Sequence, residues 1–206
     1  MTIRRILGLK IAATRLDAAV ILKFRKFWTA YNAIGDCVIL IHMSVHEHEK
    51  HARNLKVGVI TASDSRTPEN DESGKLIRSL LEAAGHLVAY YAILPDDGEK
   101  ISAALVTNLK NLDAIIVNGG TGITARDNTT EVVKSLLDKE LEGFGELFRM
   151  LSFQEIGAAA MMSRAIAGVR HGKFVAALPG SPDACRLAME KLLIPQLGHI
   201  TYLLSK

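Results

Sequence analysis

Cysteine is scarce in this sequence, and the spacings that cysteine chemistry needs are missing. Only Cys37 and Cys185 occur among the 206 residues, far apart and without a Cys-x-x-Cys pair. This usage excludes a disulfide framework and provides no zinc-binding motif. It favours the reducing cytoplasm as the location of the protein. The chain also lacks a run of 18 or more apolar residues, so the sequence predicts no membrane span.

Neither sign of charge dominates the chain. It has 25 Lys and Arg residues against 22 Asp and Glu residues, which gives a net charge of +3. Residues 1–42 hold seven basic and two acidic residues, a charge of +5, so residues 43–206 carry −2. A slightly acidic body is not expected of a general nucleic-acid-binding protein, because affinity for the phosphate backbone requires clustered Lys and Arg.

Residues 1–54 differ in composition from the rest of the chain. In residues 1–42, apolar residues recur at roughly helical spacing between basic ones, which is typical of an amphipathic helix on a membrane surface or a partner. An accessory helix and a start site placed too far upstream are the simpler explanations, and a transit peptide usually contains serine, which this segment lacks. We expect that the chain can begin at Met43 and that the histidine-containing stretch 43–54 is a solvated arm without a metal. The sequence therefore predicts one domain at residues 55–206, preceded by an extension at 1–54.

Apolar runs and amphipathic segments alternate from Leu55 onward. Strands are predicted at 55–62, 86–94, 113–118, 165–169 and 173–178, and helices at 75–84, 101–112, 128–137 and 144–154. Asn128 and Glu131 have the spacing of a capping box, and Ser181 followed by Pro182 is typical of the start of another helix. This alternation predicts an α/β protein with a mostly parallel sheet covered by helices on both faces.

Polar or glycine-rich loops follow four of the predicted strands. They are residues 61–66 with Ser63 and Asp64, residues 95–98 with Asp96 and Asp97, residues 119–127, and residues 179–182 with Gly180 and Ser181. In an open parallel sheet, ligands bind beyond the carboxyl ends of the strands. We therefore expect these four loops to meet at one edge of the sheet.

The sequence Gly119-Gly120-Thr121-Gly122 matches neither a Walker motif nor a Gly-x-Gly-x-x-Gly fingerprint. It is open to two interpretations: a tight turn that needs the positive φ tolerated by glycine, or a cradle of backbone amides that binds an anion.

The aspartates near this motif are common turn formers when each is taken alone. Their joint placement beside the glycines suggests a site for magnesium and phosphate, because hard cations prefer carboxylate oxygens and bridge them to phosphates. No Ser/His/Asp order, His-Glu-x-x-His helix or activated cysteine stands out. Phosphoryl or nucleotidyl transfer needs none of these groups, since it depends on positioning and charge neutralisation.

Several of these motifs, taken in order, resemble the molybdenum-cofactor biosynthesis protein B family, which is MoaB/MogA-like. The resemblance covers about residues 55–198, and the first 42 residues match nothing in it. The matching stretches are Thr61-Ala-Ser-Asp-Ser-Arg66, Leu94-Pro-Asp-Asp97, Asn118-Gly-Gly-Thr-Gly122, Ala125-Arg-Asp127, Glu142-Gly-Phe-Gly-Glu146, Ser163-Arg164 and Leu178-Pro-Gly-Ser-Pro182.

The resemblance implies a three-layer α/β/α molybdopterin-binding fold and a magnesium-dependent transfer of AMP from ATP to molybdopterin, with release of pyrophosphate. By motif, Asp96 and Asp127 match the family's catalytic carboxylates and would hold Mg²⁺. Gly119, Gly120, Thr121 and Gly122 match its ligand-binding loop. Ser63, Asp64, Gly180 and Ser181 complete the expected substrate-binding residues.

Two alternatives to this activity stay open in the sequence. Residues 142–157 look most like the B branch, some of whose members bind molybdopterin without catalysis, whereas the related molybdate-insertion class carries extra domains that this chain lacks. The resemblance also implies a homotrimer or hexamer, for which Ala158–Met162 are either contact or core residues. The sequence does not decide between molybdenum and tungsten as the metal finally inserted.

Overall fold

The computed structural model describes residues 54–206. The predictions of an accessory helix in residues 1–42, a start at Met43 and a solvated histidine arm lie outside the described residues. Within the described part of the chain, no helix is long and apolar enough to cross a membrane.

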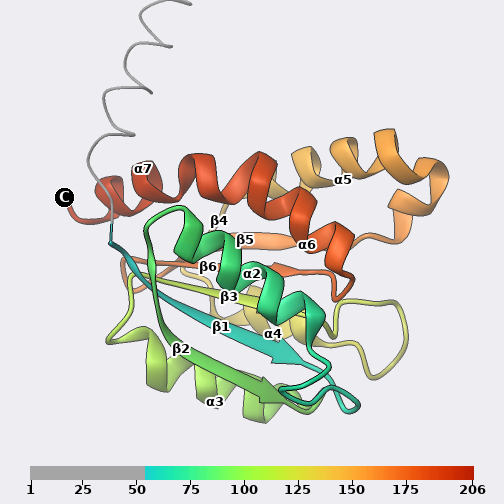
Figure 1. The fold of residues 1–206 in the computed structure, drawn as a ribbon, viewed down its shortest axis with the longest axis horizontal. Coiled ribbons are helices and arrows are strands. Elements are labelled where there is room, and N and C mark those ends of the chain that lie inside the picture. Colours follow the sequence, from blue (N-terminus) through green and yellow to red (C-terminus); the bar gives the residue numbers. More distant parts are fainter. Residues whose placement is uncertain (1–53) are drawn as a thin grey trace, which may run out of the picture. The chain divides into compact units, whose positions relative to one another are not determined.

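A six-stranded sheet forms the centre of the described part, in the order β2-β1-β3-β6-β5-β4 (Figure 1). Neighbouring strands run parallel from β2 to β6, whereas β5 is antiparallel to β6 and β4 to β5. The strands are β1 (Lys56–Ala62), β2 (Leu87–Leu94), β3 (Ala114–Asn118), β4 (Lys139–Glu140), β5 (Ile166–Arg170) and β6 (Lys173–Leu178). The carboxyl ends of β1, β2, β3 and β6 therefore lie at one edge of the sheet.

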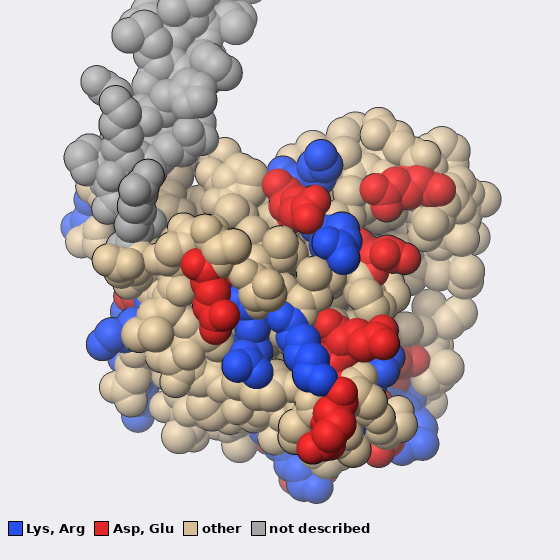
Figure 2. All heavy atoms as spheres, in the orientation of Figure 1, with Lys and Arg blue, Asp and Glu red and all other residues tan. Residues whose placement is uncertain are grey.

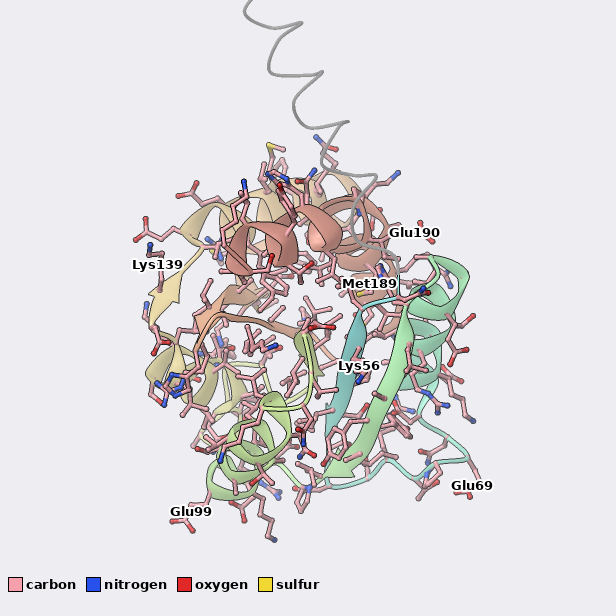
Figure 3. All side chains as sticks on the ribbon, turned by 90° about the vertical axis from the view of Figure 1, so that its left-hand side faces the viewer. Lys56, Glu69, Glu99, Lys139, Met189 and Glu190 are labelled. Carbon is pink, nitrogen blue, oxygen red and sulfur yellow. The ribbon has the colours of Figure 1, made fainter. Side chains whose placement is uncertain are left out.

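Helices cover both faces of this sheet and make a three-layer α/β/α sandwich, as expected (Figures 1 and 3). One layer holds α2 (Glu72–Ala83), α5 (Glu142–Ile156), α6 (Pro182–Ala188), the π-helical η3 (Met189–Leu193) and α7 (Ile194–Leu204). The other holds α3 (Gly98–Leu109) and α4 (Thr129–Leu136), and the 3-10 helix η2 (Gly157–Met162) follows α5. Figure 3 labels Met189 in the first layer.

Side chains of the strands alternate between two hydrophobic cores. In β1, Val57 and Val59 join the cluster under α2, α5, α6 and α7, whereas Ile60 and Ala62 join the cluster under α3 and α4. Both sets are almost completely buried. Burial on both faces explains why these strands are nearly continuous apolar runs in the sequence.

Local predictions at α4 and α2 need correction. The capping box at α4 does not form, because Asn128 makes no side-chain cap hydrogen bond and Glu131 pairs with Arg164 instead. Helix α2 begins three residues before the predicted start, because the Asp71 carboxylate accepts a hydrogen bond from the Gly74 backbone N–H at 2.9 Å and caps the helix there.

Charges of both signs are intermixed on the face seen in Figure 2. No single-sign field extends over this face, in agreement with the balanced composition.

Candidate functional site

A polar cavity of about 480 Å³ lies at the carboxyl ends of β1, β3 and β6. All four loops that the sequence placed at this edge contribute to its lining, through residues 61–63 with 65 and 66, residue 96, residues 119–122 with 127, and residues 179–181. A further wall comes from Ala159 and Met162 of η2 and from Ser163 and Arg164, a pair that the sequence analysis quoted only as part of the family resemblance. The volume is in the range of small-molecule sites.

Most of the predicted site residues line this cavity, and Asp64 does not. The lining includes Ser63, Asp96, Gly119, Gly120, Thr121, Gly122, Asp127, Gly180 and Ser181. Asp64 and Asp97 are absent from it. Asp97 is the N-cap of α3 and accepts hydrogen bonds from the Glu99 and Lys100 backbone N–H groups at 3.0 and 3.3 Å. Asp97 therefore caps a helix and does not belong to the cavity.

The glycine loop after β3 is a tight turn that requires its first two glycines. Gly119 and Gly120 have φ values of +89° and +59°, which lie in the left-handed region that other residues avoid. A Cβ atom on Gly119 would lie 2.2 Å from the Ala62 carbonyl oxygen, and one on Gly120 would lie 2.3 Å from the Thr129 hydroxyl oxygen. The turn interpretation is confirmed, and the backbone of this turn lines the cavity.

Asp127 is held by its own loop. Its Oδ2 accepts hydrogen bonds from the Thr124 hydroxyl at 2.6 Å and from the Thr124 backbone N–H at 2.9 Å. These bonds, the Thr124 hydroxyl first, together with the Gly122 amide and the positive charge of Arg164, hold the pKa of Asp127 below its usual value. Asp127 is therefore ionised at neutral pH and presents a fixed negative charge to the cavity.

Asp96 has the opposite environment. Its Oδ1 is buried and has no hydrogen-bond partner among residues 54–206. Burial first, and then the nearby carboxylates of Asp64 and Asp127, raise its pKa above the usual value. A buried carboxylate oxygen without a partner is unfavourable. A bound cation would give this oxygen a partner and would reduce the repulsion between the carboxylates. Carboxylate oxygens of this kind are what a hard cation prefers, although residues 54–206 hold no group of three His, Cys, Asp or Glu side chains placed to bind a metal.

Asp64 links three loops at the rim of the cavity. Its Oδ1 accepts a hydrogen bond from the Asp96 backbone N–H at 3.2 Å, and its Oδ2 pairs with the Arg126 guanidinium. These contacts connect the loops that follow β1, β2 and β3. Asp64 therefore holds the Asp96 loop in place, in addition to any contact that it makes with a ligand.

A buried polar network forms the floor of the cavity, and the sequence analysis missed it. The Asp71 carboxylate, which is fully buried, accepts hydrogen bonds at 2.6 Å from both the Thr61 hydroxyl and the Tyr91 hydroxyl. Thr61 in turn accepts a bond from the Asn118 side-chain amide at 3.2 Å. Burial, followed by the contact with Asp71, raises the pKa of Tyr91. The only sequence signal for this network was an Asp three residues before a Gly at the start of a helix.

The loop after β6 closes the remaining side of the cavity. Gly180 accepts a hydrogen bond from the Ser73 hydroxyl at 2.6 Å, and a Cβ atom on it would lie 3.1 Å from the Gly119 Cα. The Ser181 hydroxyl accepts a bond from the Ala184 backbone N–H at 3.4 Å and caps α6, as predicted. The close approach of these two loops explains the need for a glycine at position 180.

The fold and the cavity together define a class: an α/β sandwich that binds a small, polar ligand at the carboxyl ends of its parallel strands. A family described as "Probable molybdopterin binding domain" matches residues 58–199. The chain belongs to this family, which confirms the resemblance drawn from the motifs.

Relatives and solved structures agree with this assignment. The molybdenum cofactor biosynthesis protein B of Bacillus cereus is 51% identical over 168 residues, covering 80% of this chain and 99% of the relative. That of Halalkalibacterium halodurans is 52% identical over 162 residues, covering 77% and 95%.

Among solved structures, a molybdenum cofactor biosynthesis protein B superposes with a TM-score of 0.73 at 51% identity, covering 74% of this chain and 97% of the other. The tungsten cofactor synthesizing protein MoaB of Pyrococcus furiosus has a TM-score of 0.68 at 39% identity, covering 75% and 99%.

Proposed function

We propose that the protein is a molybdopterin adenylyltransferase, which transfers AMP from ATP to the terminal phosphate of molybdopterin and releases pyrophosphate. The observation that carries the proposal is that Asp96 and Asp127 share one polar cavity with a glycine loop. The names of the relatives support the pathway, and they include both molybdenum and tungsten cofactor proteins. Because ATP is a substrate, we place the reaction in the cytoplasm.

The proposed step is a displacement at phosphorus. An oxygen of the terminal molybdopterin phosphate attacks the α-phosphorus of ATP and forms a new phosphorus–oxygen bond. The bond from that phosphorus to the oxygen shared with the β-phosphate breaks, and pyrophosphate leaves with the electron pair. The nucleophile belongs to the substrate, so the protein contributes positioning and charge stabilisation.

The cavity residues divide this work among them. Asp96 and Asp127 would hold Mg²⁺, which when bound neutralises charge on the phosphate oxygens. The backbone of Gly119–Gly122 and the Thr121 side chain would hold an anionic group of the substrates. The loop of Gly180 and Ser181 would contact the pterin. Ser63 lines the same cavity, and Asp64 fixes the Asp96 loop.

An assay of AMP transfer tests the proposal directly. Purified protein is mixed with molybdopterin and ATP labelled at the α-phosphate, with Mg²⁺ and with a chelator. We expect labelled adenylyl-molybdopterin and one pyrophosphate per transfer, only with Mg²⁺. Molybdopterin binding without any transfer would overturn the proposal and favour a noncatalytic pterin-binding protein.

We also propose that the protein associates with further copies of itself through an apolar surface on α5 and η2. Leu147, Met150, Phe153 and Ile156 recur every three residues along α5 and are each about half exposed or more, and Met161 of η2 is 84% exposed. The predicted contact segment 158–162 thus reaches the surface, although Ala160 is buried. Ala159 and Met162 of the same η2 segment line the cavity.

Light scattering on the purified chain tests this association. We expect a homo-oligomer, and Phe153→Glu should reduce its mass. Leu87→Glu is the matched control, because Leu87 is 55% exposed on β2, at the other end of the sheet. A monomeric wild-type protein, or equal effects of the two variants, would contradict the proposal.

A further inference from the structure

Arg164 makes several contacts at the cavity wall. Its Nε donates a hydrogen bond to the Thr121 carbonyl at 3.0 Å, and its Nη2 donates to the Asp127 carbonyl at 3.0 Å. The two Nη groups also pair with the Glu131 carboxylate, with 3.2 Å between Nη2 and Oε2. The guanidinium thus joins Thr121 and Asp127, both in the loop 119–127, to the first turn of α4.

The contact to Thr121 also orients the next backbone amide. A trans peptide unit directs its C=O and N–H groups to opposite sides. Because the Thr121 carbonyl points to Arg164, the Gly122 N–H of the same peptide unit points away from it. A Cβ atom on Gly122 would lie 2.7 Å from the Asp127 Oδ2, so this peptide unit packs against the Asp127 carboxylate. Arg164 therefore fixes a peptide that borders the Asp127 carboxylate.

We propose that Arg164 is a positioning residue, which holds the glycine loop and the Asp127 carboxylate in the geometry required for AMP transfer. The inference rests on the proposed function and adds to it a residue outside the four loops. Glu131 on α4 forms an ion pair with the Arg164 guanidinium and holds it in position. The site thus depends on Arg164, which lies between η2 and β5, whereas Asp96 follows β2 at the other end of the sheet.

The planar guanidinium explains why arginine is required at this position. The N–H donors of the guanidinium lie in one plane, so their three hydrogen-bond directions are fixed relative to one another. A lysine ammonium is a compact charge on a flexible stem and cannot hold all three partners in this way. Arg164→Lys keeps the positive charge near Asp127 and loses the fork. Arg164→Ala loses both. The two variants therefore separate the electrostatic effect of Arg164 from its positioning effect.

Arg170 provides a matched control. Its side chain is 29% exposed, the same as that of Arg164, and it pairs with a carboxylate, Asp138, at 3.0 Å. It lies at the end of β5 and does not line the cavity. Arg170→Ala therefore removes the ion pair of an equally exposed arginine without touching the glycine loop.

Amide hydrogen exchange gives the readout that does not depend on activity. The Thr124 and Asp127 backbone amides are hydrogen-bonded within the loop, to the Asp127 carboxylate and the Thr124 carbonyl. We expect Arg164→Ala to accelerate their exchange by about tenfold or more while the amides of β3 stay protected. Arg170→Ala should leave both amides unchanged.

Steady-state kinetics then connects the loop to the reaction. We expect kcat to fall by about 10²-fold in Arg164→Ala and about tenfold in Arg164→Lys, because misplaced groups lose the benefit of orientation. Millimolar guanidinium should restore part of the activity of Arg164→Ala, and Glu131→Gln should give a smaller loss of kcat. Arg170→Ala should retain activity.

The outcomes distinguish the two proposals. If the wild-type protein transfers no AMP, the proposed function fails, and hydrogen exchange together with calorimetry of ATP binding with Mg²⁺ still tests Arg164. Unchanged exchange at Thr124 and Asp127 in Arg164→Ala would overturn the positioning role. So would a loss in Arg170→Ala equal to that in Arg164→Ala. If Arg164→Ala does not fold, hydrogen exchange and kcat of Arg164→Lys and Glu131→Gln are compared with those of Arg170→Ala instead.

Discussion

Replacement of Gly119 by alanine should disrupt the cavity, and Gly85 is its matched control. The two glycines have nearly equal φ values, +89° and +85°, so an L-residue costs about 1–2 kcal/mol at either position. Their surroundings differ. A Cβ atom on Gly119 would lie 2.2 Å from the Ala62 carbonyl oxygen, whereas one on Gly85 meets nothing within 4 Å. The difference between the two variants therefore isolates the steric clash from the backbone strain.

The clash at Gly119 has no easy relief. Ala62 ends β1, where it is paired with Leu94 of β2, and the preceding residue Thr61 is paired with β3, so the backbone at Ala62 is held by the sheet. The glycine loop must move instead. We expect Gly119→Ala to lower the free energy of unfolding by about 1–3 kcal/mol more than Gly85→Ala, the usual cost of overpacking.

Urea-induced unfolding measures that difference, and calorimetry with ATP and Mg²⁺ measures the effect on the site. We expect Gly85→Ala to bind ATP normally and Gly119→Ala to bind it at least about tenfold more weakly, because the amides of the loop are displaced. Equal free energies of unfolding for the two variants would refute the steric argument. Normal ATP affinity in Gly119→Ala would refute the placement of the ligand against this loop.

Three further predictions concern single aspartates. Asp127→Asn keeps an acceptor for Thr124 and removes the charge, so AMP transfer should fall by about 10²-fold while molybdopterin binding survives; normal turnover in the folded variant contradicts the role. Asp96→Asn should raise the melting temperature at neutral pH but not below pH 3.8, the ordinary pKa of an Asp side chain. The pKa of Asp96 is higher in the folded protein, so ionisation of Asp96 lowers the stability of the fold as the pH rises above 3.8, and the variant avoids this loss. Equal changes in melting temperature at both pH values would contradict this. Asp71→Asn should lower the free energy of unfolding by about 1–3 kcal/mol, since an amide replaces a buried acceptor of two hydroxyl donors; unchanged denaturant unfolding contradicts this.

The fold was predictable wherever burial leaves a pattern in the sequence. Strand β6 has the bounds that were predicted, 173–178, because it is an apolar run enclosed by turn residues. Helix starts were less accurate. Helix α3 begins at Gly98 and not at 101, because Asp97 caps it and the first turn contributes no apolar periodicity. The two-residue strand β4 is too short to leave any pattern.

The site was predictable as far as topology alone determines it. Parallel strands bring their following loops to one edge, so the meeting of Asp96, the glycine loop and Ser181 follows from the order of elements. Contacts between distant segments did not follow. Glu131 was expected to cap its own helix, but its partner is an arginine 33 residues away. Pairing of that kind depends on how loops pack, which no local spacing records.

The opposite environments of the two cavity carboxylates bear on whether the protein transfers AMP or only stores molybdopterin. Negative side chains beside the proposed phosphate-binding loop would repel a phosphate, so a protein selected only to store the ligand would gain nothing from them. Asp127 stays ionised through contacts with its own loop, and Asp96 carries a buried oxygen without a partner in the described residues. Both features become favourable once a divalent cation lies between carboxylate and phosphate. A metal-bridged phosphate is what nucleotidyl transfer requires and storage does not. The dependence of ATP affinity on Mg²⁺, compared between the wild type and Asp96→Asn, therefore separates the two functions: a large dependence that the variant loses supports transfer, and affinity independent of Mg²⁺ in both supports storage.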